Sequence, residues 1–145
     1  MDKKKGKFVV IDGLDGVGKG VFLDTFIECA KINRKTIFEV DYFWKKFNEH
    51  PGIEEIKKWM PDIIVTSEPT YMGVGKYIRD ELISNNRKRR YSTQTIAEAY
   101  ALDRRILYES LILPALKNGI DVYQSRSLSS SIVYQRQSAI DEGDK

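Results

Sequence analysis

A glycine-rich loop near the start of the chain constrains the fold more than any other feature. Residues 8–11 (FVVI) form a short apolar, β-branched run that is typical of a buried strand. Residues 19–34 place apolar side chains at helical spacing, which predicts a helix. The loop between them fits the pattern G-x-x-x-x-G-K, with Gly13, Gly18 and Lys19 at its fixed positions. A strand, such a loop and a helix in direct succession predict an α/β fold with a phosphate-binding loop.

The chemistry of this loop suits a nucleotide. Glycines let backbone N–H groups turn toward an anion, and the N-terminus of the following helix adds partial positive charge. The Lys19 ammonium would reach the β and γ phosphates. Gly20 stands where a hydroxyl residue usually holds Mg²⁺, so we expect that ion to be bound mainly through the nucleotide and waters. The predicted ATP-binding residues are Gly13, Leu14, Asp15, Gly16, Val17, Gly18, Lys19 and Gly20. A plain glycine-rich turn is the alternative.

The rest of the chain alternates between strand and helix patterns. Further strands are predicted at residues 36–40, 62–66 and 120–125, and helices at 75–84 and 95–117. Thr95 and Glu98 fit a capping box at the start of the long helix, Pro114 is expected to kink its last turn, and Gly119 to end it. Irregular structure or short helices are expected over residues 41–59, and the start of another helix over 129–140. This alternation predicts a parallel sheet flanked by helices.

Composition narrows the class of protein. With 145 residues, 41% of them hydrophobic and 31% charged, the chain is expected to form one domain over residues 1–145 with a packed core. No apolar run reaches the roughly 18–20 residues that cross a bilayer. A single cysteine, Cys29, and a single histidine, His50, exclude a structural zinc site and fit a cytoplasmic protein. A net charge of +3 is too small to indicate a nucleic-acid partner.

Three smaller features leave alternatives open. The basic run at residues 87–90 is expected to be a solvated loop, although cations beside an aromatic can also bind a single nucleic-acid strand. Trp44, Phe47 and Trp59 are expected in the core or in a local cap, with a dimer face as the alternative. Cys29 is expected to be a small buried hydrophobic side chain rather than a nucleophile.

Several segments in a fixed order carry a family resemblance. They are VIDGLDGVGK (10–19), TSEPT (66–70) followed by Gly75 and Ile78-Arg79, YALDR (100–104), LPAL with Gly119 (113–119), and SRS followed by Ser130 and Tyr134-Gln135 (125–135). The order and spacing of these segments resemble the thymidylate kinases, which are nucleoside monophosphate kinases. The resemblance covers most of residues 8–135 and implies a three-layer P-loop NTPase fold.

The resemblance also implies an activity and a set of residue roles. It implies transfer of the γ-phosphoryl group of ATP to dTMP, giving dTDP. Whether the enzyme forms a homodimer stays open. Lys19, Asp15 and Arg126 would be catalytic. Tyr100 would stack on thymine, Arg104 would meet its carbonyl oxygen, and Arg126 would grip the monophosphate. The implied substrate-binding residues are Asp15, Glu68, Tyr100, Arg104, Arg126, Ser130, Tyr134 and Gln135. Without the resemblance, Tyr100 would be a core residue and Arg104 a surface one.

Three positions depart from the family pattern. Ser67 replaces an arginine, Ser125 replaces an aspartate that would hold metal-bound water, and Thr70-Tyr71 replaces a pair of glycines. A nucleotide-binding module, or a related deoxynucleoside monophosphate kinase with weak or no turnover, therefore stays open. The family continues into an arginine-bearing lid and a further strand, so we expect this chain to be incomplete at its C-terminus, without that strand and lid, and poorly stable alone.

Overall fold

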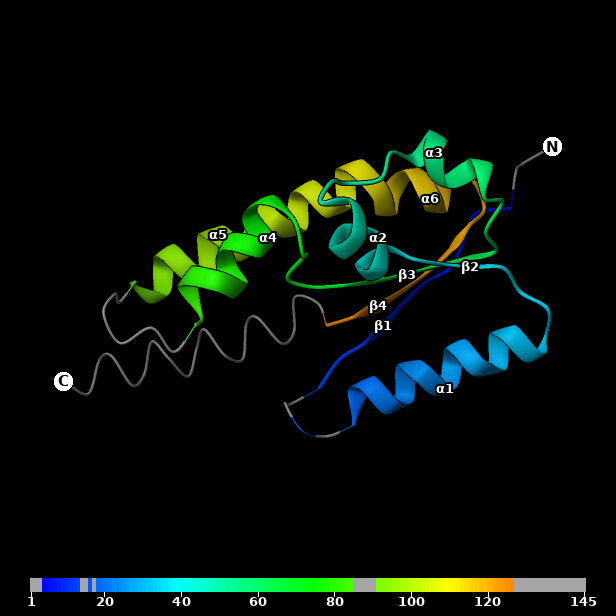
Figure 1. Cartoon of the computed structure of the whole chain (residues 1–145), viewed down its shortest axis with the longest axis horizontal. Coiled ribbons are helices and arrows are strands. Elements are labelled where there is room, and N and C mark those ends of the chain that lie inside the picture. Colours follow the sequence, from blue (N-terminus) through cyan, green and yellow to red (C-terminus); the bar gives the residue numbers. More distant parts are fainter. Residues whose placement is uncertain (1–3, 14–15, 17, 85–90, 127–145) are drawn as a thin grey trace.

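The structure, a computed structural model, describes residues 4–13, 16, 18–84 and 91–126. Within them lies a four-stranded, all-parallel sheet of strand order β1–β4–β3–β2 (Figure 1). The strands are β1 (Phe8–Ile11), β2 (Ile37–Glu39), β3 (Ile63–Ser67) and β4 (Asp121–Ser125). Ser125 pairs with Ile11 on one side and with Ser67 on the other, so three strands end level. The predicted parallel α/β sheet is confirmed.

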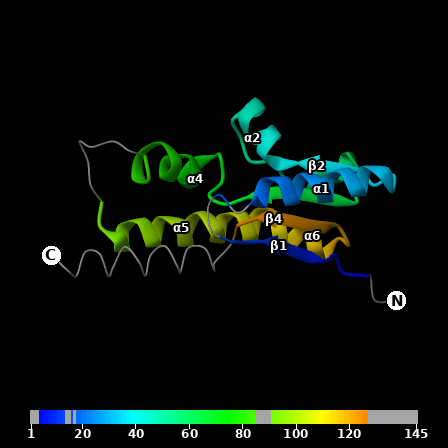
Figure 2. The ribbon, with the colours of Figure 1, turned by 90° about the horizontal axis from the view of Figure 1, so that it is seen from below.

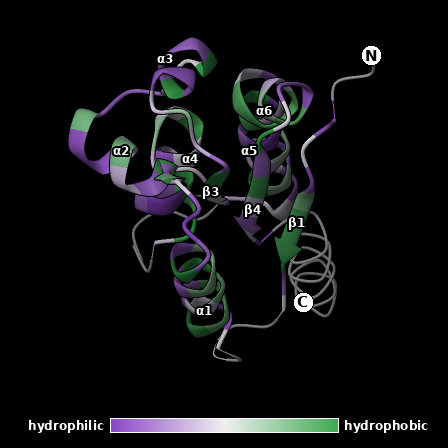
Figure 3. Ribbon diagram, turned by 90° about the vertical axis from the view of Figure 1, so that its right-hand side faces the viewer, coloured by the Kyte–Doolittle hydropathy of each residue, from purple (hydrophilic) through white to green (hydrophobic). Residues whose placement is uncertain are grey.

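Helices form a layer on each face of the sheet (Figure 3). The helical elements are α1 (Lys19–Ile32), α2 (Val40–Phe47), α3 (Ile53–Lys58), α4 (Gly73–Tyr77), η1 (Ile78–Leu82), α5 (Thr93–Leu107), η2 (Tyr108–Ile112) and α6 (Leu113–Lys117), of which η1 and η2 are π-helical. α1 covers one face. α5, η2 and α6 follow one another as a long rod over the other (Figures 1 and 2).

Side chains alternate between the two faces along each strand, so each face of the sheet has its own core. The two cores differ in size among the described residues. The larger core, on the α5–α6 side, contains Val40, Trp44, Ile56, Ile64, Leu107, Leu111, Ile112, Ala115, Ile120 and Val122. The smaller core, under α1, contains Ile27, Ile63 and Val65. Three strands end in polar residues, β2 at Glu39, β3 at Ser67 and β4 at Ser125, and the functional site described below lies at this edge of the sheet.

Four helix boundaries differ from the sequence prediction by two residues, including the ends of α1 at Ile32 and of η1 at Leu82. α5 begins at Thr93, and its cap is Ser92, whose Oγ accepts a 3.2 Å hydrogen bond from the Thr95 amide. The expected capping box at Thr95 is therefore wrong: three hydroxyl residues stand in this segment, and the first one that can reach an exposed amide caps the helix. α4 begins at Gly73 rather than Gly75. The wide π-helical turn η2 ends at Ile112, two residues before Pro114, which lacks an N–H to donate.

The burial of individual side chains tests the predictions for residues 41–59 and for Cys29. Residues 41–59 do contain two short helices, α2 and α3, and Trp44 is in the core at 1% exposed. Phe47 and Trp59 are 51% and 65% exposed. Cys29 is exposed, which corrects its expected burial: it lies two residues from buried Ile27, on the opposite side of α1. None of the described helices is long and apolar enough to cross a membrane. The basic run at 87–90 lies outside the described residues.

Candidate active site

The predicted phosphate loop connects β1 to α1, as the sequence indicated. Gly16 and Gly18 have φ angles of 82° and 88°, a region that glycine occupies at no steric cost. The Lys19 ammonium turns back over the loop and donates a 2.7 Å hydrogen bond to the Gly13 carbonyl oxygen. The first turn of α1 has neither an acidic residue nor a side-chain cap, so its N–H groups and the lysine present positive charge together.

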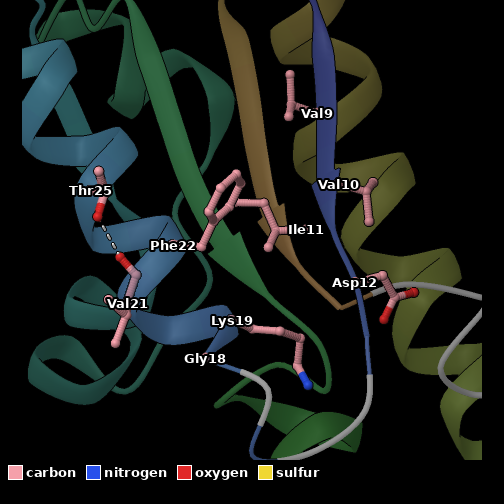
Figure 4. Close-up of a pocket in the computed structure, with 9 residues that line it drawn as sticks. All are labelled: Val9, Val10, Ile11, Asp12, Gly18, Lys19, Val21, Phe22 and Thr25. Atoms are coloured by element: carbon pink, nitrogen blue, oxygen red, sulfur yellow. Dashed lines mark hydrogen bonds between the residues drawn. The ribbon is translucent and has the colours of Figure 1, made fainter.

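A cavity of about 650 Å³ opens beside the loop, between β1 and α1 (Figure 4). Its charged side chains, Asp12 and Lys19, lie at the loop end (Figure 4). Its wall along α1 includes Thr25, whose hydroxyl donates a 2.8 Å bond to the Val21 carbonyl. The complete lining is Val9, Val10, Ile11, Asp12, Gly18, Lys19, Val21, Phe22 and Thr25. A pocket with apolar walls and the Lys19 ammonium at one end suits a ligand that carries phosphates.

A buried carboxylate, Glu68, lies at the end of β3. It is 3% exposed and precedes a cis peptide bond to Pro69. Its Oε2 accepts 2.8 Å and 2.7 Å bonds from Nε and Nη2 of Arg104, and its Oε1 accepts a 2.7 Å bond from the Gln124 amide. Burial raises the pKa of Glu68, and the Arg104 guanidinium and the Gln124 amide oppose that rise. The carboxylate therefore holds the guanidinium in one orientation.

The residue after β4, Arg126, lies next to the start of the phosphate loop. Its backbone N–H donates a 2.9 Å bond to the Ile11 carbonyl, and its own carbonyl accepts a 2.9 Å bond from Gln124. Its φ angle of 69° lies in the left-handed region, which is uncommon for an arginine. Arg126 thus leaves the sheet at the same carboxyl edge from which the phosphate loop leaves, where ligands of open α/β sheets bind.

The turn that follows Pro69 is fixed to α5 and to η1. The Thr70 amide and hydroxyl donate bonds of 2.8 Å and 2.7 Å to the two carboxylate oxygens of buried Asp103. Nε of Arg79 donates to the carbonyls of Pro69 (2.9 Å) and Thr70 (3.2 Å), and its guanidinium lies 3.9 Å from the centre of the Tyr71 ring. Thr70 therefore replaces a glycine of the family pattern with a side chain that anchors the turn.

Ser67, at the position of a family arginine, contacts a carboxylate instead. Its hydroxyl donates a 2.6 Å bond to Oδ2 of Asp41, which lies in the first turn of α2. The other oxygen, Oδ1, is buried without a hydrogen-bond partner among the described residues. Burial raises the pKa of Asp41, while the Ser67 bond and the nearby cations Arg79 and Lys45 lower it. No sequence pattern indicated that α2 would bring a carboxylate here.

Of the residues assigned by resemblance, the structure brings Glu68 and Arg104 into direct contact and places Arg126 two residues beyond Gln124. Tyr100 precedes Arg104 by four residues on α5, so the two share a helix face. The other predicted site residues, Leu14, Asp15, Val17, Ser130, Tyr134 and Gln135, lie outside the described residues. Sequence reasoning missed Gln124 and Asp103, although a polar residue within a central strand was a usable signal.

The described residues contain no cluster of three or more acidic, histidine or cysteine side chains that could hold a metal ion. Gly20 and Ser125 also lack the hydroxyl and the carboxylate that the family pattern would offer. This set of residues fits Mg²⁺ that arrives with a nucleotide and keeps most of its waters, and it does not fit a cage of protein ligands.

The fold and the loop define the class: an α/β protein of the P-loop NTPase type. The sequence model of the family described as thymidylate kinase matches residues 54–143. The chain belongs to the thymidylate kinase family.

Relatives agree with this assignment, and a solved structure agrees with the fold. The thymidylate kinase of Prochlorococcus marinus (strain MIT 9301) is 29% identical over 140 residues, covering 90% of this chain and 52% of that protein. The probable thymidylate kinase of Thermococcus gammatolerans is 34% identical over 135 residues, with the same shares. The crystal structure of thymidylate kinase from Ehrlichia chaffeensis matches with a TM-score of 0.58 at 18% identity, covering 90% of this chain and 58% of that one. The chain spans about half the length of the curated relatives it matches.

Proposed function

We propose that this chain carries the donor and acceptor sites of an enzyme that transfers the γ-phosphoryl group of ATP to dTMP. One observation carries the proposal: the phosphate loop with Lys19 and the residue Arg126 leave adjacent parallel strands at the same edge of the sheet. Two phosphate-binding groups on neighbouring strands can align a donor and an acceptor, and phosphoryl transfer requires mainly alignment and charge neutralisation.

Each residue of the site then has a physical task. The loop N–H groups and Lys19 would hold the phosphates of ATP, and Arg126 would hold the phosphate of dTMP. Arg104, oriented by Glu68, would donate to the thymine carbonyl, with Tyr100 against the base. A phosphate oxygen of dTMP forms a bond to the γ-phosphorus as the bond to the β–γ bridging oxygen breaks, which yields dTDP and ADP. Mg²⁺ bound through the nucleotide supplies charge neutralisation when present.

A second candidate function is nucleotide binding with weak or no turnover. It is favoured by Ser67, whose hydroxyl is held by Asp41 where the family pattern has a cation. Ser125 favours the same function, since this serine at the end of β4 replaces the aspartate of the family pattern. The homodimer and the cytoplasmic location stay predictions, as does the extension of one domain over residues 1–145.

A coupled assay together with calorimetry distinguishes the two candidates. The parent chain is supplied with ATP, Mg²⁺ and each of dTMP, dUMP, dCMP, AMP and GMP as acceptor. We expect dTDP to form with dTMP, and we expect Lys19→Ala to lower turnover by about 100-fold or more, since it removes a charge that acts on the transferring group. Lys31→Ala, on the exposed side of the same helix, is the matched control and should leave turnover unchanged.

One outcome would reject the kinase alone, and another would reject both candidate functions. Binding of ATP and dTMP without any diphosphate product would support the binding module and reject the kinase. If Lys19→Ala binds ATP as well as the parent chain does, the loop is not the donor site and both candidates fail.

A further inference from the structure

Gln124 is a buried amide inside the central part of the sheet. It lies on β4, between β1 and β3, and its side chain is 0% exposed. Its register partners are Val10 on β1 and Thr66 on β3, and the preceding residue on the same face of β4 is the fully buried Val122. An apolar side chain could fill this buried position without any hydrogen bond. An amide is unfavourable there unless its polar atoms are hydrogen-bonded. The amide therefore needs a specific explanation.

Both N–H groups of this amide donate to residues of the candidate acceptor site. Nε2 donates a 2.7 Å bond to Oε1 of Glu68 and a 2.9 Å bond to the backbone carbonyl of Arg126. Both partners are acceptors, so the nitrogen and not the oxygen of the amide must face them. The oxygen, Oε1, has no partner among the described residues. The side chain is therefore oriented by these two contacts and by no other hydrogen bond in that part of the chain.

The two contacts join groups that come from different elements. Glu68 also accepts two bonds from the guanidinium of Arg104, on α5. Arg126 follows β4 directly. A continuous path of hydrogen bonds thus runs from the backbone at Arg126 through Gln124 and Glu68 to the side chain of Arg104. These two arginines are the groups proposed above to hold the phosphate and the base of the acceptor.

We infer that Gln124 is a positioning residue that fixes the spacing between Arg126 and Arg104 and thereby favours binding of the acceptor nucleotide; this rests on the proposed function. Gln124 does not touch the substrate. Its amide donates to the carboxylate of Glu68, which orients Arg104, and to the backbone carbonyl of Arg126. A nucleoside monophosphate that spans both arginines binds well only when their separation is fixed, because misplacement loses one of the two contacts.

The first test replaces the amide by an apolar group of similar size. Gln124→Leu leaves Oε1 of Glu68 without its donor, and we expect the KM for dTMP to rise at least tenfold while the KM for ATP changes less than twofold. Thr66→Val is the matched control: its hydroxyl is equally buried, lies at the paired position on β3 and has no hydrogen-bond partner among the described residues. It should leave both KM values within twofold of the parent's. A Gln124→Leu variant with the parent's KM for dTMP would overturn the inference.

A second variant gives a readout that a purely structural role would not move. Gln124→Glu keeps the shape but puts a second carboxyl against Glu68, with Asp103 adding like charge and Arg104 opposing it. Two carboxyl groups in such contact share one proton. We expect dTMP affinity measured by calorimetry to be at least tenfold weaker than the parent's at pH 8 and to recover toward it at pH 5.5. Because the dTMP phosphate also titrates in this range, the parent provides the reference, and a pH dependence no steeper than the parent's would count against the path.

A third measurement needs no nucleotide, so it separates this inference from the proposed function. The parent's Arg104 should give a slowly exchanging Nε–H signal in ¹H–¹⁵N spectra, identified by its loss in Arg104→Lys. We expect the signal to persist in Thr66→Val and to exchange at least tenfold faster in folded Gln124→Leu or, at pH 8, Gln124→Glu. If the parent fails to bind dTMP, the proposed function fails. An unchanged signal in these Gln124 variants would instead contradict the inference itself.

Discussion

At the scale of single residues, a contact between His50 and Trp44 makes folding sensitive to pH. The indole Nε1 of Trp44 donates a 3.0 Å bond to Nδ1 of His50, and the two rings meet edge to face with centroids 5.7 Å apart. A nitrogen that accepts this bond must be unprotonated. Burial lowers the pKa of His50, and the charge of Asp103 opposes that shift. The folded chain therefore binds a proton at this ring less readily than the unfolded chain does.

The sign of the resulting pH dependence follows directly. Below the ordinary histidine pKa of about 6.5, the unfolded chain takes up a proton that the folded chain does not, so the free energy of unfolding falls as the pH falls. The slope is bounded by about 1.4 kcal/mol per pH unit for one proton. We expect His50→Gln, whose amide oxygen can accept the same bond, to flatten the dependence between pH 7 and pH 5.5. Urea unfolding at several pH values measures it, and equal slopes for both proteins would contradict this origin.

Residues that act locally could be predicted from the sequence, and those that act through distant partners could not. The phosphate loop is contained in one short segment, so its pattern was enough to predict it. Glu68 contacts Arg104 and Gln124, which are 36 and 56 positions away in the chain. Hydrophobic periodicity places such residues on strands or helices but does not say which side chains meet. The resemblance assigned Glu68 to the site, yet its two partners became visible only in the folded chain.

At the scale of elements, the contact between α4 and the turn after β3 depends on one glycine. A Cβ added to Gly75 would lie 2.3 Å from the Thr70 hydroxyl and 2.5 Å from the Thr70 backbone nitrogen and oxygen. Thr70 cannot move aside easily, because Asp103 holds both its amide and its hydroxyl. The helix and the turn therefore approach each other as closely as a glycine allows.

Gly75→Ala is accordingly expected to destabilise the chain. Overpacking of this kind costs about 1–3 kcal/mol, since either α4 or the Thr70 turn must shift. Gly20→Ala serves as the control, because nothing lies within 4 Å of its added Cβ and alanine favours the helix. Chemical denaturation of the two variants compares them. A Gly75→Ala variant as stable as the Gly20→Ala variant would show that the turn can relax without cost.

The limits of helices were harder to predict than their existence. Apolar periodicity located α1 and the α5–α6 rod, and a strand was found at each predicted segment. The start of α5 was displaced because Ser92, Thr93 and Thr95 can all act as caps, and the choice depends on where the chain enters the helix. Short helices such as α2 and α3 were only one of two expectations, since a few turns carry too little periodic signal.

At the scale of the whole molecule, the two helical layers are held with unequal strength. Among the residues that the structure describes, the α5–α6 side buries ten residues in its core and the α1 side buries three. α1 itself contributes one buried side chain, Ile27, which is 8% exposed, while Val21 and Phe22 are 71% and 55% exposed. Burial of apolar surface is the main source of stability, so α1 is expected to open more easily than α5. The helix that carries the phosphate loop is thus the less firmly attached one.

This asymmetry can be measured by native-state hydrogen exchange. We expect amides of α1 to exchange through a local opening of lower free energy than the opening that exposes α5. ATP at about 100 times its Kd should slow the exchange of α1 by about 100-fold, because a ligand that binds only the closed form adds about 2.7 kcal/mol to its stability. Ile27→Ala should speed exchange in α1 alone, whereas Ile112→Ala, in the larger core, should speed it in both helices. Equal protection of α1 and α5 in the parent would mean that the layers open as one unit, and the weaker core would then have no consequence for the phosphate loop.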